Sequence, residues 1–154
     1  MTVSFFVNGI PKTAGSKRAF MRPGMKFPVI VDDCKKGADW KGDVKRFAVD
    51  HWKDVPTTEP VRVRFSFYFP RPASHFGSGR NIGTLKSSAP VCHTKKPDVD
   101  KCSRACLDAL TGIVWKDDAQ VVSKLVTKDY GKKPGVEIVI ETLQFHTAEV
   151  LPAT

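Results

Sequence analysis

Apolar and polar residues alternate along residues 61–69, which read V-R-V-R-F-S-F-Y-F. A period of two places successive side chains on opposite faces, so this segment is predicted to be a strand with one buried face. Prolines on both sides of the segment bound the strand. Shorter apolar runs predict four more strands, at residues 3–7, 27–31, 120–126 and 136–141.

Two further segments carry apolar residues at helical spacing. Residues three or four apart share one face of a helix, so both segments are predicted to be amphipathic helices. Asp98 or Asp100 stands where the N-cap of the second helix belongs, and Gly112 supplies its stop signal. The first helix spans residues 39–52 with Trp40, Val44, Phe47 and Ala48, and the second spans residues 100–110 with Cys102, Ala105, Cys106, Ala109 and Leu110.

Segments without either period are predicted to be loops. Residues 12–22 form a basic, glycine-containing loop, and residues 128–135 form a basic turn with Pro and Gly. Residues 73–94 are rich in Ser, Gly, Pro and basic residues, which predicts a long, mobile loop. This loop is either a solvated insertion or a segment that follows a nucleic-acid backbone through Arg71, His75, Arg80 and Lys86.

The order of these elements predicts an α+β protein, in which two main helices pack on one face of a mixed or antiparallel sheet. We expect a single domain at residues 1–145 and a C-terminal tail at residues 146–154. No run approaches the roughly 20 apolar residues of a membrane span, and the N-terminus lacks the pattern of a secretory signal. A cytoplasmic protein with reduced cysteines is therefore expected.

The charge of the chain points to an anionic partner. The formal net charge is +9 over 154 residues, and the pI is about 9.5. Clustered Lys and Arg release counterions from a phosphate backbone on binding, so a nucleic acid is the expected partner. The alternative is a solvated basic surface, and charge alone does not separate DNA from RNA or a nuclease from a passive binder.

Four carboxylates gather in one short segment of this basic chain, at Asp98, Asp100, Asp117 and Asp118. A pair at i and i+2 can aim both carboxylates at one point, and a third would complete an oxygen site for Mg²⁺ or Mn²⁺. Such an ion assists phosphodiester cleavage. Asp118 reaches this point only if the chain folds back beyond the helix or a second subunit contributes. The alternative is that these residues are helix caps and surface charges.

Basic residues near the carboxylates allow two interpretations. Arg104 follows Asp100 by four and precedes Asp108 by four, which predicts either an exposed ion-pair ladder or a contact to the scissile phosphate. Lys101 is a second candidate for that contact. Residues expected to contact the DNA backbone are Lys12, Lys17, Arg18, Lys95 and Lys96.

A zinc-bound interaction module is a weaker alternative. Cys92, His93, Cys102 and Cys106 would suffice as ligands, but no C-x-x-C pair exists. The two cysteines of the second helix also fit its apolar face. Residues 9–17 contain glycines and lysines without the spacing of a phosphate-binding loop, so nucleotide binding is not expected.

Residues 96–121 read K-P-D-V-D-K-C-S-R-A-C-L-D-A-L-T-G-I-V-W-K-D-D-A-Q-V. The run closely resembles the RusA family of Holliday-junction resolvases, which occur in bacteria and their phages and prophages. The family pattern is D-x-D at a helix start, then D-A-L, then D-D-x-Q-V leading into a strand. All of these elements are present here in order. The segment 73–94 is longer than the connection found in compact members of the family.

The resemblance implies a homodimer that binds four-way DNA junctions and nicks two strands symmetrically with Mg²⁺. It implies that Asp98, Asp100 and Asp118 are the essential carboxylates and that Asp117 is accessory. A functional lysine of the family corresponds to Arg104, and Lys and Arg differ in geometry and hydration. It also implies a bacterial cytoplasm and a phage or prophage origin. The alternatives are a nuclease for flaps and forks, or a non-catalytic DNA-binding protein on the same scaffold.

Overall fold

The computed structural model of this chain describes residues 1–13, 17–20, 23–24, 26–27, 29–32 and 35–144. Residues 17–20, 29–32 and 35–38 are described for their backbone only. The helices and strands follow the order β1 (Thr2–Asn8), β2 (Lys17–Phe20), β3 (Val29–Asp32), α1 (Lys35–His51), β4 (Val61–Phe69), α2 (Val99–Leu110), β5 (Val121–Tyr130) and β6 (Gly135–Thr142).

Four strands form one mixed sheet in the order β1-β6-β4-β5. The pairs β1–β6 and β6–β4 are antiparallel, whereas β4 and β5 are parallel. Two adjacent parallel strands require a crossover connection, and α2 lies within that connection. The register places Val63 opposite both Ile140 and Lys124, which brings these positions to the same face of the sheet.

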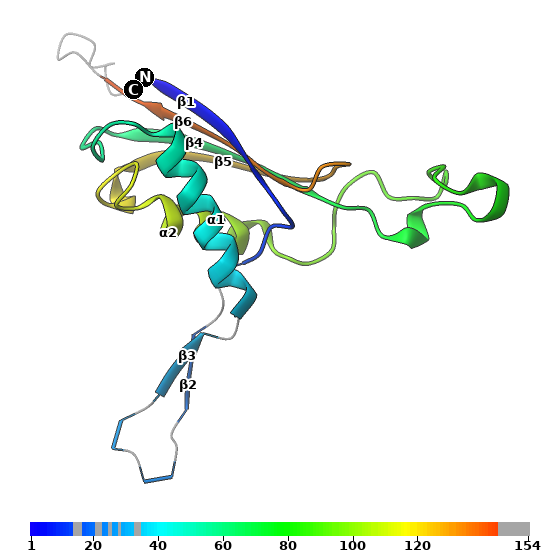
Figure 1. The fold of residues 1–154 in the computed structure, drawn as a ribbon, viewed down its shortest axis with the longest axis horizontal. Coiled ribbons are helices and arrows are strands. Elements are labelled where there is room, and N and C mark those ends of the chain that lie inside the picture. Colours follow the sequence, from blue (N-terminus) through cyan, green and yellow to red (C-terminus); the bar gives the residue numbers. More distant parts are fainter. Residues whose placement is uncertain (14–16, 21–22, 25, 28, 33–34, 145–154) are drawn as a thin grey trace, which may run out of the picture.

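Both helices pack on one face of this sheet, α1 over β1 and α2 over β5 (Figure 1). The alternation along β4 has the expected effect, because Val61, Val63, Phe65, Phe67 and Phe69 are all buried beneath the helices. Each fully buried side chain of this size stabilises the fold by about 2–3 kcal/mol. The predicted class is therefore confirmed: a single α+β domain with a mixed sheet and two helices on one face.

The opposite face of the sheet remains uncovered in the described chain. Arg62 and Arg64 of β4 and Leu125 of β5 are exposed there, and Arg62 pairs with Glu141 of β6 at 3.0 Å.

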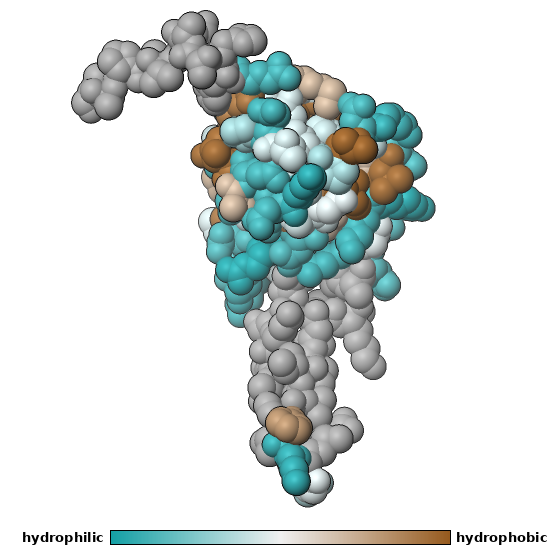
Figure 2. Space-filling view, turned by 90° about the vertical axis from the view of Figure 1, so that its left-hand side faces the viewer, coloured by the Kyte–Doolittle hydropathy of each residue, from teal (hydrophilic) through white to brown (hydrophobic). Residues whose placement is uncertain are grey.

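Figure 2 views the end of the molecule opposite the long segment 73–94, and hydrophilic residues cover most of that end. Among the described residues, neither helix is long and apolar enough to cross a membrane.

The prediction of a loop over residues 12–22 is wrong at its centre. Lys17–Phe20 forms β2, which pairs antiparallel with β3 in a separate two-stranded sheet. This hairpin extends from the beginning of α1, away from the main sheet (Figure 1). The predicted second strand, residues 27–31, corresponds to β3 with a shift of its bounds. The sequence K-R-A-F shows no alternation, and backbone pairing with β3 forms the strand.

Other boundaries also differ from the prediction. Helix α1 begins at Lys35 rather than at residue 39, and β5 continues to Tyr130 rather than ending at residue 126. Segment 73–94 contains no α-helix or strand, but short 3₁₀ turns occupy Ala73–His75 and Gly79–Asn81. Its mobility stays a prediction. The predicted tail, residues 146–154, lies outside the described residues.

Candidate active site

The two carboxylates of the D-x-D motif lie together at the beginning of α2. Asp98 is the N-cap residue, with an extended backbone at φ −68° and ψ 137°, and its carbonyl oxygen accepts the amide of Cys102 at 3.1 Å. Its side chain makes no capping hydrogen bond. Capping therefore does not use the Asp98 carboxylate. Asp100 lies in the first turn, and the side chains of Asp98 and Asp100 are 62% and 71% exposed.

Three cations surround these two carboxylates. Lys101 Nζ lies 3.9 Å from Asp98, Arg104 lies 3.9 Å from Asp100, and Lys124 Nζ lies 3.7 Å from the other oxygen of Asp100. Exposed pairs at such distances contribute little to stability. Their importance lies in their position. They place several N–H donors beside two accessible carboxylates, where a phosphate oxygen could accept hydrogen bonds from them.

Arg104 does not form the predicted ladder with both of its acidic neighbours. It lies beside Asp100, one turn earlier, whereas Asp108 pairs with Lys41 of α1 at 3.2 Å. The guanidinium therefore lies next to the D-x-D pair. From this position Arg104 could reach a phosphate at the site. The exposed pair with Asp100 is also present, so both interpretations of Arg104 stay predictions.

Sequence reasoning missed two lysines of β5 that define this site. Lys124 Nζ lies 3.1 Å from the hydroxyl of buried Ser103 as well as near Asp100. Lys128 Nζ donates to the carbonyls of Lys95 and Pro97 at 2.7 and 3.0 Å, which ties the segment before Asp98 to β5. Both lysines point to the helix-covered face, where alternation predicts apolar residues. The sequence signal for Lys124 was a lysine at an alternating position, between Val122 and Val126, of the predicted strand.

Asp118 lies at the other end of α2. Its Oδ1 accepts the indole N–H of Trp115 at 2.9 Å and the hydroxyl of Thr111, the C-cap residue of the helix. Eleven residues separate Asp100 from Thr111, which at 1.5 Å per residue is about 16 Å. The structure therefore does not bring Asp118 to Asp98 and Asp100 within one chain. The predicted three-carboxylate metal site is not formed by a single copy.

The remaining residues of D-D-x-Q build the turn that holds Asp118. Asp117 Oδ1 accepts the amide of Ala119 at 2.7 Å, and the side-chain oxygen of Gln120 accepts the amides of Lys116 and Asp117 at 3.0 Å. The amide nitrogen of Gln120 donates to the carbonyls of Thr57 and Glu59. Asp117 thus has the structural role of a cap, and the accessory role expected from the family resemblance stays a prediction.

A groove of about 440 Å³ adjoins the start of α2, and Lys12 and Lys96 both line it. Lys96 precedes Asp98 by two residues, so the groove leads to the D-x-D pair. Lys95 is exposed in the same segment. These are three of the five residues predicted to contact DNA. Lys17 and Arg18 lie in β2, and their side chains fall outside the described part of the chain.

The cysteines of α2 face the core. Cys102 and Cys106 are both fully buried, and burial raises the pKa of Cys102 to about 11 and that of Cys106 still further. Cys92 is exposed in segment 73–94. This arrangement matches the predicted apolar stripe and lends no support to a zinc site that depends on Cys102 and Cys106.

The burial of these thiols predicts their reactivity. In a Cys34→Ser background at pH 8, a thiol reagent should label Cys92 rapidly and leave Cys102 and Cys106 unreacted until the protein is unfolded, because the thiolate is the reactive form. Mass spectrometry of the labelled peptides measures this difference. Fast labelling of Cys102 or Cys106 in the folded protein would contradict the core position of α2.

The donor set at the start of α2 suits a magnesium ion. Mg²⁺ is commonly held by one or two carboxylates together with waters and substrate phosphates, and Asp98 and Asp100 are accessible enough to serve in this way. Across the described ranges, no three His, Cys, Asp or Glu residues form a group that could hold a metal. One copy of the chain therefore offers a pair of carboxylate ligands.

Two comparisons with known proteins show which family this chain is similar to. The family model described as "Endodeoxyribonuclease RusA" matches residues 12–141. The chain belongs to the RusA endodeoxyribonuclease family. The match includes the D-x-D pair, α2, the D-D-x-Q turn and β5. The uncharacterized protein YqaN of Bacillus subtilis (strain 168) is 33% identical over 138 residues, which cover 90% of this chain and 94% of the relative. RusA family membership implies endodeoxyribonuclease activity.

Proposed function

We propose that this protein is a Mg²⁺-dependent endonuclease that resolves four-way DNA junctions by paired nicks. The observation that carries the proposal is the exposed pair Asp98 and Asp100, which three cations surround at the end of a groove lined by Lys12 and Lys96. A polyanionic substrate can approach these carboxylates because the surrounding charge is positive. The protein is expected to act in recombination, repair or phage DNA processing.

The acidic and basic residues of the candidate site have different roles in the proposed phosphodiester cleavage. Asp98 and Asp100 would hold the ion and would accept hydrogen bonds from the attacking water. When bound, the ion (Mg²⁺, with Mn²⁺ as a substitute) acidifies that water and stabilises charge on the phosphate. Arg104 and Lys124 donate to the non-bridging phosphate oxygens, with Lys101 at the edge of the site. The oxygen of the water forms a bond to phosphorus as the bond to the leaving oxygen breaks; one proton of the water passes to solvent, and solvent protonates the leaving oxygen.

The position of Asp118 supports a homodimeric site. Within one copy its carboxylate lies about 16 Å along α2 from Asp100, yet Asp118 is exposed and its Oδ2 is free of hydrogen bonds among the described residues. Paired nicks require two sites, which a symmetric dimer provides. We propose that Asp118 of one copy completes the site that contains Asp98 and Asp100 of the other.

The substrate panel that tests this function contains a labelled four-way junction, a flap, a fork and a linear duplex, each with Mg²⁺ or EDTA. The expected result is paired nicking of the junction with Mg²⁺ and no cleavage with EDTA. Equal cleavage of flaps and forks would instead support a nuclease of broader range. Binding without any cleavage would support a non-catalytic DNA-binding protein. A bacterial cytoplasm and a phage or prophage origin stay predictions from the sequence.

Lys124 provides a test of the charge balance at the site. Lys124→Met should lower the cleavage rate about tenfold, because one donor to the phosphate is lost. It should also lower the half-saturating Mg²⁺ concentration about fivefold, since a cation about 4 Å from the carboxylate opposes the ion by about 1 kcal/mol in a water-like medium. Cleavage rates measured across a Mg²⁺ titration report both values.

The matched control is Lys45→Met, because Lys45 is exposed on α1 and pairs with neither Asp98 nor Asp100. It should change neither value. A purely structural role of Lys124 would reduce the unfolding temperature and leave the Mg²⁺ dependence unchanged, which would contradict the charge argument.

A further inference from the structure

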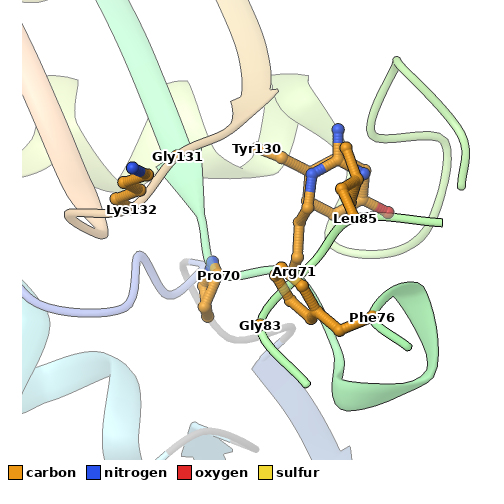
Figure 3. A pocket seen from close by; sticks show the side chains of 8 residues that line it. All are labelled: Pro70, Arg71, Phe76, Gly83, Leu85, Tyr130, Gly131 and Lys132. Atoms are coloured by element: carbon orange, nitrogen blue, oxygen red, sulfur yellow. The ribbon is translucent and has the colours of Figure 1, made fainter. Parts of the chain in front are cut away.

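A second groove, of about 530 Å³, lies between segment 70–85 and the turn that joins β5 to β6 (Figure 3). Apolar side chains and cations line it together, and none of its described lining residues is acidic. Its volume falls within the range of ordinary small-molecule sites. The residues that define its walls are Pro70, Arg71, Phe76, Leu85, Tyr130 and Lys132.

Hydrogen bonds and close packing hold the walls of this groove. The amide of Gly77 donates to Thr84 and the amide of Lys86 donates to His75, both at 2.9 Å, so the segment pairs with itself. A Cβ on Gly77 would lie 2.5 Å from the Cβ of Asn81, which shows how closely this turn is packed. Backbone hydrogen bonds and packing within the segment therefore define the shape of the groove.

Arg71 and Tyr130 join the segment to the sheet. The guanidinium of Arg71 lies 4.4 Å from the centre of the Tyr130 ring and donates to the carbonyl of Pro90 at 2.7 Å. His93 packs against the same tyrosine at 4.8 Å. The beginning and the end of the long segment thus meet at Tyr130, and this contact fixes the position of the groove relative to β5.

The chemistry of the walls fits a nucleotide. The ring of Phe76, the side chain of Leu85 and the guanidinium plane of Arg71 offer flat and apolar surfaces, which are the surfaces that stack on an unpaired base. Lys132 places a cation at the groove, where a backbone phosphate can pair with it. An apolar ligand without charge would leave the cation of Lys132 unused.

The groove also lies near the candidate active site. Lys128 holds the carbonyl before Asp98, and Tyr130 follows two residues later, about 7 Å along β5. The groove that Lys12 and Lys96 line shares Pro70 with this one. The two grooves therefore adjoin, and both lie close to the start of α2.

We propose that the groove lined by Phe76 and Lys132 binds an unpaired nucleotide of the DNA strand that passes the D-x-D pair. The proposal rests on the proposed function, because it takes branched DNA as the substrate. It adds a contact that an intact duplex cannot make, since paired bases are stacked within the helix. Segment 73–94 then contributes to the selection of branched over linear DNA.

The test is a binding titration in EDTA, so that cleavage does not interfere. Fluorescence anisotropy is measured with a single-stranded oligonucleotide and with a duplex of the same sequence. Phe76→Ala should weaken single-strand binding about tenfold, the size of one lost base stack, and should leave duplex binding unchanged. Lys132→Ala should reduce the salt dependence of single-strand binding by about one phosphate contact.

Two controls match these substitutions. Ile82→Ala removes an exposed apolar side chain from the same segment outside the groove, and Lys133→Ala removes the neighbouring lysine, which instead lies 4.7 Å over the Phe6 ring. Both should bind single strands like the wild type. Circular dichroism melting of all four variants confirms that each one is folded.

The outcomes separate the two proposals. If the wild type nicks junctions but Phe76→Ala and Lys132→Ala bind single strands like the wild type, the groove proposal is overturned and the proposed function stands. If the wild type cleaves no branched DNA while Phe76→Ala still weakens single-strand binding selectively, the nucleotide site stands and the nuclease proposal is overturned.

Discussion

Asp100→Asn is expected to reduce junction cleavage more than about a hundredfold while leaving junction binding intact. The carboxylate is one of two that are proposed to hold the ion, and the charge stabilisation that a metal supplies is worth several kcal/mol. A loss of about 3 kcal/mol in the transition state corresponds to roughly a hundredfold in rate. Asn keeps the shape of Asp and removes its charge, so the fold of α2 should persist.

The measurement is single-turnover cleavage of a labelled junction at saturating protein, with affinity determined separately in EDTA. The matched control is Asp108→Asn, because Asp108 is on the same helix and pairs with Lys41 of α1 instead. This control should cleave within about threefold of the wild type, since an exposed pair contributes at most about 1 kcal/mol. Cleavage by Asp100→Asn at the control rate would refute the metal-site assignment.

Mixed dimers should recover the activity that each parent has lost. Asp100→Asn and Asp118→Asn are each expected to be inactive as homodimers. If Asp118 serves the site of the other copy, a dimer with one chain of each kind has one site with both substitutions and one intact site. That intact site should nick one strand of a junction. If Asp118 instead serves its own chain, each site carries one substitution and the mixed dimer stays inactive.

The mixed dimer is prepared by co-expression of the two chains with different affinity tags and purification on both in succession. Denaturing gels of a junction with one labelled strand at a time count the nicks. The doubly substituted chain, paired with itself, is the inactive control. Recovery of single nicks supports a site shared between copies, and absence of recovery in a confirmed mixed dimer would refute it.

Much of the fold follows from local patterns in the sequence. The alternation at Val61–Phe69 identifies β4 because one face of this strand is fully covered. The stripe of Cys102, Ala105 and Cys106 identifies the buried face of α2 in the same way. By contrast, β5 is an edge strand whose polar end, from Thr127 to Tyr130, gives little periodic signal. The prediction therefore ended it too early.

The parallel pairing of β4 with β5 depends on contacts between residues that are about 60 positions apart. No local pattern encodes such a pairing. The same long-range pairing explains why Lys124 and Lys128 were not predicted as site residues. Both lysines lie beside the start of α2 only because β5 pairs with β4. From the sequence, Asp98 and Asp100 stay predicted ligands with Lys101 and Arg104 nearby, whereas the place of Lys124 beside them depends on the pairing of β5 with β4.

The position of Asp118 could not be predicted from sequence spacing alone. The residues of the D-D-x-Q motif form one capped turn, in which Asp117 and Gln120 supply the capping side chains. Spacing alone left open whether the chain folds back to the start of α2. The hydrogen bond from the indole of Trp115 now places Asp118 at the far end of that helix. Spacing also allowed a contribution from a second subunit, and that alternative is the one proposed above.

The two ends of the main sheet meet at one corner. The amino group of Met1 donates to the Thr142 hydroxyl at 3.0 Å, and the amide of Thr142 donates to the carbonyl of Met1 at 2.9 Å. Figure 1 shows this corner far from segment 73–94. Ends that lie this close permit circular permutation. A short peptide could join residue 142 to residue 1, and the chain could be opened at exposed Arg80, so that the new termini lie in segment 73–94.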